Sequence, residues 1–196
     1  LKIVLKTVIG GKTISSKSDL IKLKKFLQQS IFYDTNRMND RRPWLRASAR
    51  KTLESKYGFC GENARVAIRL LKIGGVIANR IYLFGPRWQH VVVEIKWENR
   101  YYMFDGHNDS GISLSDEDIL KIPSESISLY HNDYKQNPWM DYCRIKLFKK
   151  IKALNKFQLL RPGSFIVLVT ESPYLMKGIF FIFLFICFFV LLLLIF

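Results

Sequence analysis

The chain has 196 residues, a length that suits one domain with attachments, and 31 Lys and Arg against 16 Asp and Glu give a formal net charge of +15 at pH 7. No nucleic-acid module and no glycine-rich phosphate loop is recognisable, so we interpret the excess as a solvated, lysine-rich surface and expect no nucleic-acid partner. The three cysteines, at 60, 143 and 187, have no paired spacing, which argues against a disulfide framework and a structural zinc site.

The chain begins with a short segment that precedes the first predicted helix. Residues 1–16 form this segment, and the mostly apolar residues 3–9 (IVLKTVI) are predicted as a possible strand. Ser18 is typical of a helix N-cap, and Asp19 follows it in the first turn. Apolar residues then recur with helical spacing at Leu20, Leu23, Phe26, Leu27 and Ile31.

A cysteine between two glycines begins a later helix. A helix predicted over residues 44–57 ends at Gly58 and leads the chain to Cys60. After Cys60, apolar or small residues recur with helical spacing until Gly74 and Gly75 stop the pattern. Unpaired backbone N–H groups and the helix dipole at such a position lower a thiol pKa, and the thiolate is the reactive form of cysteine.

The next elements carry a histidine and an aspartate. The segments predicted as strands are 76–84, 90–97 and 101–105, with a tight hairpin at 98–100. His90 begins its strand and Asp105 ends the following one, so antiparallel pairing places the two residues nearly opposite each other. Together with Cys60 at a helix start, they provide a nucleophile, a base and a group that orients the base.

Beyond Asp105 the sequence alternates between polar and amphipathic stretches. Ser115 and Asp118 have the spacing of a capping box, which predicts a short helix. Residues 139–157 are predicted as a basic amphipathic helix on the membrane surface. Residues 165–169 are predicted as a last strand or an interfacial segment.

The C-terminal residues predict a membrane span. The last 18 residues, 179–196, contain no charged or polar side chain except Cys187, and as a helix they are about 27 Å long. Leu175 and Met176 extend this stretch, and we predict a single-pass transmembrane helix over 175–196. Basic residues before the span favour the cytoplasmic side for the rest of the chain and attract anionic lipid headgroups.

The residues around the cysteine, histidine and aspartate resemble the transglutaminase-like superfamily. The resemblance covers roughly residues 44–109 and rests on GFCGEN at 58–63, GGVIANR at 74–80, QHVVVEI at 89–95 and YYMFDG at 101–106. The compact spacing is similar to that of the smaller bacterial members. Asn79 and the valines after His90 depart from the family pattern at positions that concern packing. The resemblance implies an α+β fold, a papain-like transglutaminase core with helices packed on an antiparallel sheet.

The resemblance also implies a reaction. Cys60 is expected to attack an amide carbonyl of a protein or peptide and form a thioester, while His90 transfers protons and Asp105 orients His90. Water or an amine then accepts the acyl group, so peptide hydrolysis, deamidation and transamidation stay open. Backbone N–H groups near Cys60 are candidates for the oxyanion site. Trp44 is a further candidate, because an upstream Trp has this role in some transglutaminases, although packing is its favoured role. No metal or organic cofactor is expected.

Three other interpretations are weighed against this one. A catalytically silent, membrane-anchored peptide-binding domain would have the same fold. An acyltransferase similar to the arylamine N-acetyltransferases also uses Cys, His and Asp. A papain-like peptidase is disfavoured, because only thirty residues separate Cys60 from His90 whereas papain-type chains place more than a hundred between them. The predicted organisation is an N-terminal segment (1–16), a transglutaminase-like core (17–135), a basic juxtamembrane segment (136–174) and a transmembrane helix (175–196).

Overall fold

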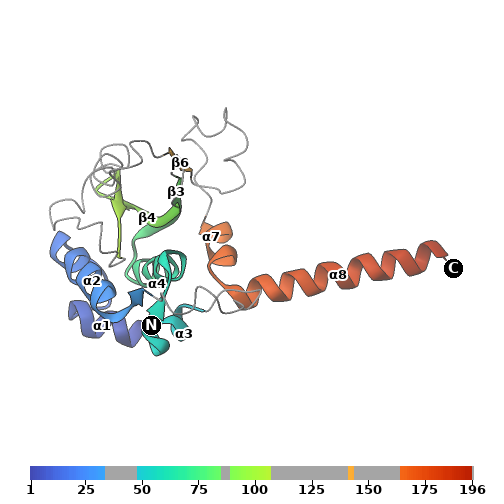
Figure 1. Ribbon diagram of the computed structural model, residues 1–196, viewed down its shortest axis with the longest axis horizontal. Coiled ribbons are helices and arrows are strands. Elements are labelled where there is room, and N and C mark those ends of the chain that lie inside the picture. Colours follow the sequence, from blue (N-terminus) through green and yellow to red (C-terminus); the bar gives the residue numbers. More distant parts are fainter. Residues whose placement is uncertain (34–47, 85–88, 107–140, 144–163, 196) are drawn as a thin grey trace.

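The computed structural model describes residues 1–33, 48–84, 89–106, 141–143 and 164–195 (Figure 1). Within these residues, helices pack on an antiparallel sheet and the last helix projects away from the domain, which confirms the predicted α+β class (Figure 1). The helices are α1 (Lys2–Ile9), α2 (Lys17–Ser30), α3 (Ala49–Ser55), α4 (Cys60–Ile73), α7 (Ser164–Thr170) and α8 (Pro173–Ile195). The strands are β1 (Phe32–Tyr33), β2 (Tyr57–Gly58), β3 (Ile77–Phe84), β4 (Gln89–Trp97), β5 (Arg100–Phe104) and β6 (Asp141–Cys143).

Helix α4 is the central helix of the fold. It contacts β3 and β4 of the sheet and also packs against α1 and α3. Its sequence suits this position because apolar side chains occur around most of its circumference, and such a helix is stable only when it is buried between other elements. The side chains that solvent does not reach at all are Val66, Ala67, Leu70 and Leu71.

The four-stranded sheet among the described residues has the order β5-β4-β3-β6, and each neighbouring pair is antiparallel. A two-residue turn joins β4 to β5, with Glu98 at φ 46° and Asn99 at φ 62°. Positive φ at both central residues is the geometry of a type I′ hairpin, whose twist matches that of the flanking strands. The turn sets the register in which Val93 pairs with Phe104, so the chain leaves β5 directly at Asp105.

A short parallel ladder positions the segment before α4. Phe32 of β1 pairs with Tyr57 of β2, and Tyr33 pairs with Gly58. A Cβ atom at Gly58 would lie 3.0 Å from Thr52 Cγ2, so only glycine allows this close approach without a shift of α3. The ladder therefore fixes the chain two residues before α4 begins.

The prediction of a strand at residues 3–9 is wrong, because these residues belong to helix α1. Leu5 and Ile9 lie four residues apart and are buried in the core, whereas Ile3 is 82% exposed. This is the period of a helix and not the alternation of a strand. The N-terminal segment therefore contributes to the same core as α2 and α4.

The start of α2 also differs from the prediction. Its N-cap is Ser16 and not Ser18, because Asp19 completes a capping box with Ser16. The Asp19 backbone N–H donates to Ser16 Oγ at 3.2 Å, and the Ser16 backbone N–H donates to Asp19 Oδ2 at 3.1 Å.

The helix predicted over residues 44–57 corresponds in its described part to α3. The helix ends earlier than predicted because Lys56, at φ 59°, closes it in the left-handed conformation and Tyr57 enters β2. Trp44 lies outside the described residues.

Two predictions for the C-terminal half are also corrected. The prediction of an amphipathic helix over 139–157 is wrong at residues 141–143, which form strand β6. This strand pairs with β3 and so provides partners for backbone groups of β3 on the side away from β4. Residues 165–169 belong to helix α7 and not to a strand, with Val167 buried in the core. The short helix predicted from Ser115 lies outside the described residues.

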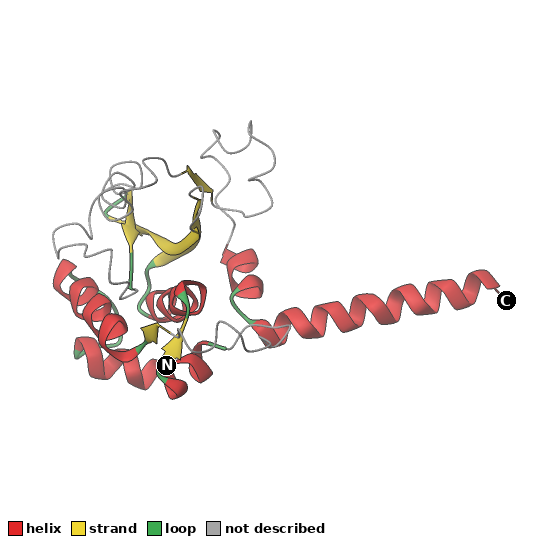
Figure 2. Ribbon diagram, viewed as in Figure 1, coloured by secondary structure: helices red, strands yellow, loops and turns green. Residues whose placement is uncertain are grey.

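Helix α8 continues from the domain as a long helix with little around it (Figure 2). In the described part of the chain, one helix is long and apolar enough to cross a membrane, and it is α8 over Pro173–Leu194. Its large apolar side chains are exposed over most of this length. The predicted span at 175–196 therefore coincides with a helix of suitable length and composition.

Candidate active site

Cys60 is the first residue of α4, half-buried at the N-terminus of the central helix. The backbone N–H of Phe59, the N-cap, donates to Glu62 Oε2 at 2.8 Å. This bond holds the Glu62 carboxylate on the N-cap backbone and so steadies the first turn of the helix. The N–H of Cys60 itself precedes the first intrahelical hydrogen bond, which leaves it available to an external acceptor.

His90 and Asp105 form a buried pair at one end of the sheet. His90 Nε2 lies 2.8 Å from Asp105 Oδ2, and the two side chains are 3% and 4% exposed. Because Phe104 pairs with Val93, the next residue, Asp105, stands opposite Val92. His90 is two residues from Val92 and therefore projects from the same face of the sheet as Asp105, at a diagonal distance that the two side chains bridge.

The thiol of Cys60 lies against His90. Burial raises the pKa of Cys60, but the hydrogen bond and the charge of His90, together with the Val91 backbone N–H, outweigh burial and bring the pKa below its ordinary value. Asp105 acts in the opposite direction as a nearby negative charge. Since Nε2 of His90 faces Asp105, Nδ1 is the ring nitrogen left for the sulfur.

The same contacts favour the charged form of His90. Burial alone would lower the pKa of His90, but the carboxylate of Asp105 and the sulfur of Cys60 raise it to about 10. At neutral pH these directions favour a thiolate on Cys60 beside an imidazolium on His90. A thiolate paired with an imidazolium is the reactive state of a nucleophilic cysteine.

Asn63 connects helix α4, which carries Cys60, to the backbone that follows Asp105. Its Nδ2 donates to the carbonyl oxygen of Gly106 at 2.9 Å, and its side chain is buried. A Cβ at Gly106 would lie 2.7 Å from Leu27 Cδ1 and 3.0 Å from Asn63 Oδ1, so the chain passes α4 and α2 with no room for a side chain. The position of Asp105 therefore depends on contacts that the next residue makes with α4.

The structure brings Cys60, His90 and Asp105 together, and their catalytic role remains a prediction. Asn63, which the sequence marks only as a polar residue in the first helical turn, also belongs to the arrangement. The second oxyanion candidate, Trp44, lies outside the described residues. Among the residues that the structure describes, no group of three or more His, Cys, Asp or Glu side chains is placed to hold a metal ion.

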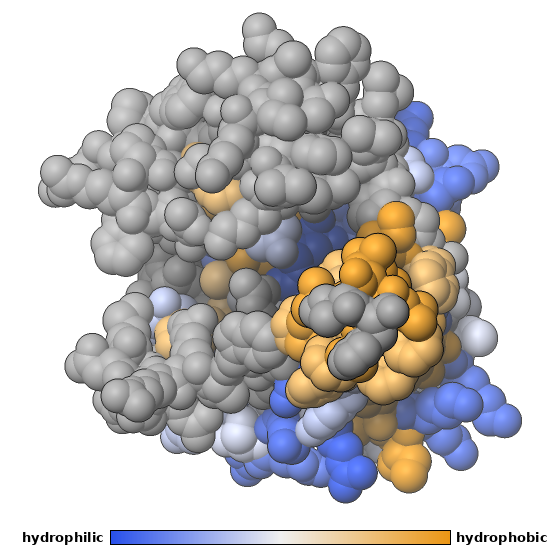
Figure 3. All heavy atoms as spheres, turned by 90° about the vertical axis from the view of Figure 1, so that its right-hand side faces the viewer, coloured by the Kyte–Doolittle hydropathy of each residue, from blue (hydrophilic) through white to orange (hydrophobic). Residues whose placement is uncertain are grey.

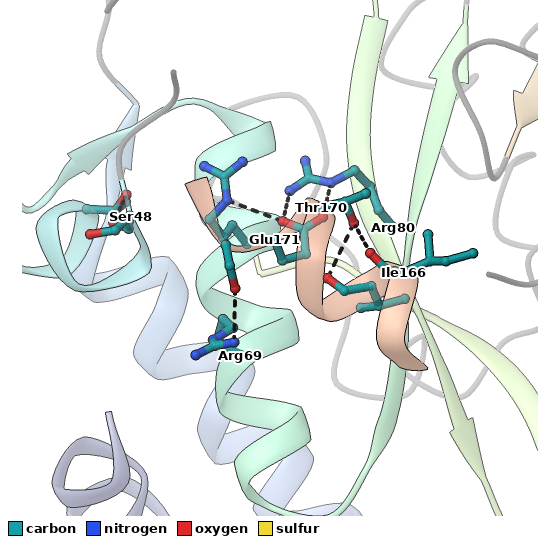
Figure 4. Close-up of polar contacts among 10 residues, drawn as sticks. Ser48, Arg69, Arg80, Ile166, Thr170 and Glu171 are labelled. Atoms are coloured by element: carbon teal, nitrogen blue, oxygen red, sulfur yellow. Dashed lines mark hydrogen bonds and ion pairs between the residues drawn. The ribbon is translucent and has the colours of Figure 1, made fainter. Parts of the chain in front are cut away.

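A buried ion cluster that the sequence does not predict includes one residue of the same helix. The carboxylate of Glu171, which follows α7, lies between Arg65 of α4 and Arg80 of β3 (Figure 4). All three side chains are less than a tenth exposed. Nothing in the local sequence pattern signals this cluster, because about ninety residues separate Glu171 from its nearer partner in the chain.

The chain matches one family model and is similar to solved structures. The profile of a family described as the transglutaminase-like domain matches residues 1–112. A candidate cysteine protease from Cytophaga hutchinsonii superposes with a TM-score of 0.43 and 20% identity, over 54% of this chain and 36% of that one. A candidate protease from Parabacteroides distasonis ATCC 8503 gives a TM-score of 0.43 and 12% identity, over 53% of this chain and 22% of that one.

The chain thus covers about a third and a fifth of the two solved proteins. No curated protein matches it. The family match extends over more than half of the chain and includes α1 through β5, so it contains the elements that carry the candidate site. The resemblance drawn from the sequence motifs is confirmed.

Proposed function

Because this chain belongs to the transglutaminase-like domain family, we propose that it is a membrane-anchored thiol enzyme that transfers an acyl group from an amide through a thioester on Cys60. The observation that carries the proposal is the buried pair of His90 and Asp105, 2.8 Å apart, against a thiol at the start of a helix. Such a combination lowers a thiol pKa, and Cys60 is half-buried, as a reactive cysteine usually is.

In the first half of the reaction, the Cys60 thiolate attacks the carbonyl carbon of the amide. The C–O π electrons move to oxygen, and the backbone N–H of Cys60 donates to the resulting oxyanion. As the oxyanion collapses, the C–N bond breaks and the His90 imidazolium gives its proton to the leaving amine. The products of this half are a free amine, a thioester on Cys60 and a neutral His90.

In the second half, His90 accepts a proton from the incoming water or amine as it attacks the thioester. The C–S bond then breaks, and the sulfur leaves as a thiolate beside the newly formed imidazolium. Asp105 holds the ring through Nε2 in both halves and stabilises the cation, which keeps Nδ1 directed at the sulfur. Water as acceptor gives hydrolysis or deamidation, and an amine gives transamidation.

The anchor is the apolar helix α8, with the domain on the cytoplasmic side. The basic residues that precede the apolar stretch support this orientation through the positive-inside rule. Substrates would then be proteins or peptides that reach the membrane surface from that side.

The experiment is the alkylation of Cys60 by iodoacetamide as a function of pH. The full chain in detergent micelles is used, and modification is read by mass spectrometry of the peptide that contains Cys60, with Cys60→Ser as the background. We expect rapid modification that persists well below pH 8.5 in the wild type and is lost in His90→Ala. A Cys60 that titrates like an ordinary thiol, unchanged by His90→Ala, would contradict the proposal and favour a peptide-binding domain without activity.

A second measurement distinguishes the acceptors. Glutamine-containing peptides are incubated with the full chain, with and without a primary amine. Release of ammonia without the amine indicates deamidation, whereas incorporation of the amine indicates transamidation. Neither product forms in Cys60→Ser if the thioester is obligatory.

A further inference from the structure

Helix α8 is fixed to the domain by a buried ion cluster at its base. Glu171 Oε1 accepts from Arg80 Nε at 2.6 Å, and Glu171 Oε2 lies 2.5 Å from Arg80 Nη2 and 3.3 Å from Arg65 Nε (Figure 4). The two bonds to Arg80 are bidentate, the strongest geometry for such a pair. Pro173, the first residue of α8, follows only two residues later, so α8 leaves the domain directly from a buried contact.

The charges make this joint hard to open. Both guanidiniums stay protonated at every physiological pH, and withdrawal of Glu171 would take the bidentate carboxylate partner away from the buried Arg80. Arg69 Nη1 adds a weaker contact to Ser172 Oγ at 3.4 Å (Figure 4). The start of α8 therefore has a defined position against α4 and does not swing on a linker.

This fixed position brings a lysine of the domain to the first turn of α8. Lys51 Nζ of α3 lies 5.9 Å from the centroid of the Tyr174 ring, and Lys177 Nζ of α8 lies 6.0 Å from the same centroid. Tyr174 is 60% exposed and Lys51 is exposed, whereas Lys177 is half-buried, so the ring and the Lys51 side chain are open to solvent. We refer to these three residues, Lys51, Tyr174 and Lys177, as the Tyr174 collar.

The Tyr174 collar lies at the depth of lipid headgroups when α8 spans a bilayer. Lys177 is the last charged residue of α8, and the uninterrupted apolar stretch begins at Ile179. Tyr174 lies five residues before Ile179, about 7.5 Å along a helix, and the headgroup layer on each side of the hydrocarbon is about 5–7.5 Å thick. Figure 3 looks along α8 toward the domain and shows hydrophilic surface beside and below the apolar helix.

We propose that the Tyr174 collar binds the headgroup of an anionic phospholipid. Two ammonium groups, one from the domain and one from the anchor, each lie about 6 Å from the ring centroid of one exposed tyrosine. Both attract the negative charge of a lipid headgroup, and the phenol can donate a hydrogen bond to it. A tyrosine at this depth is also the usual interfacial anchor of a membrane helix. This proposal rests on the proposed anchoring by α8. It adds that anionic phospholipids bind at the base of α8 and thereby orient the domain on the membrane.

The experiment measures acetylation of single lysines by a water-soluble acetylating reagent. The full chain is reconstituted in vesicles of phosphatidylcholine, or of phosphatidylcholine and phosphatidylglycerol at three to one, and each lysine is followed by mass spectrometry. Lys22, which is exposed on α2, is the internal reference. Figure 1 shows α2 on the side of the domain away from α8. We expect the acetylation rates of Lys51 and Lys177, relative to that of Lys22, to be about fivefold lower in the anionic vesicles. The attraction between an anionic surface and one nearby ammonium group favours the bound, protonated group by about that factor in its equilibrium constant.

A matched pair of variants separates the collar from general surface charge. Lys51→Gln should return the acetylation rate of Lys177 to its value in phosphatidylcholine, whereas Lys22→Gln should leave the protection of Lys177 unchanged. Equal rates for Lys51 in the two vesicles, or equal effects of the two variants, would overturn the collar alone. Extraction of the full chain by alkaline carbonate would instead overturn the anchoring by α8 and the collar with it.

Discussion

Asn63 donates a hydrogen bond to the carbonyl of Gly106, and this bond joins the helix that begins at Cys60 to the residue that follows Asp105. The two partners are 43 residues apart in the chain, and the bond between them is buried. The hydrogen bond therefore helps to hold Asp105 at its distance from Cys60, although neither of these two side chains takes part in it.

Replacement of Asn63 by alanine should weaken both the fold and the site. The buried carbonyl of Gly106 loses its donor, which costs about 1–3 kcal/mol in the free energy of unfolding. The pH profile of Cys60 alkylation should also move toward that of an ordinary thiol, because Asp105 is no longer held in place. Urea unfolding and iodoacetamide kinetics measure the two effects.

Lys72→Ala is the control for this variant, since Lys72 is exposed on the same helix. It should change neither the unfolding free energy nor the alkylation profile appreciably. A loss of stability in Asn63→Ala with an unchanged alkylation profile would mean that Asn63 supports the fold without positioning the site.

Substitution of Gly106 by alanine tests the close passage of the chain. The new Cβ would lie 2.7 Å from Leu27 Cδ1 and 3.0 Å from Asn63 Oδ1, so the buried Leu27 side chain, the Asn63 side chain or the backbone at residue 106 must shift. Overpacking of this kind costs about 1–3 kcal/mol. Gly11→Ala is the matched control, because the nearest atom to its Cβ would be Thr13 O at 3.7 Å, an ordinary contact. Equal unfolding midpoints for the two variants would contradict the close passage.

The three residues of the candidate site could be predicted from the sequence because each lies at the boundary of a strongly patterned element. Cys60 is flanked by glycines before a helical repeat, and His90 and Asp105 bound two strands joined by a short turn. The two-residue turn leaves little freedom of register, so the pairing of the strands follows from the sequence almost directly.

The ion cluster at Glu171 could not be predicted, because its partners meet only through tertiary packing. Arg80 lies on a strand and Arg65 on a helix, where each alone is typical of an exposed side chain. The strand predicted at residues 3–9 was wrong for a related reason: the apolar residues of this short segment, which Lys6 and Thr7 interrupt, fit both periods, and burial of Leu5 and Ile9 in the core decided for the helix.

Loss of the Glu171 charge should destabilise the whole domain. Glu171→Gln retains the shape of the side chain but removes the charge that is paired with the buried Arg80, and breaking a buried pair costs about 3–5 kcal/mol. Urea unfolding of the full chain in micelles gives the change. Glu54→Gln is the control, since its ion pair with Arg50 is exposed on α3 and should contribute far less. Similar losses in the two variants would show that the Glu171 cluster is not a structural joint.

The buried pair of His90 and Asp105 predicts how stability depends on pH. The pKa of His90 is raised from its ordinary 6.5 to about 10, so its contribution is complete below pH 6.5 and is lost as pH rises toward 10. The pKa of Cys60 is lowered, so its contribution grows with pH up to the ordinary thiol pKa of about 8.5. The two trends oppose each other near neutrality, and the wild type should therefore lose stability mainly between about pH 8.5 and 10.

Two variants separate these contributions. In Cys60→Ser the opposing trend is absent, while Asp105, the largest contribution that raises the His90 pKa, remains, so the decline should begin near pH 7. In Asp105→Asn the decline should be much weaker, because the charge that stabilises the imidazolium is gone. Unfolding midpoints in urea between pH 6 and 10, at constant ionic strength, measure all three proteins. A wild type and an Asp105→Asn variant with parallel pH dependence would show that His90 is not held as a cation by Asp105.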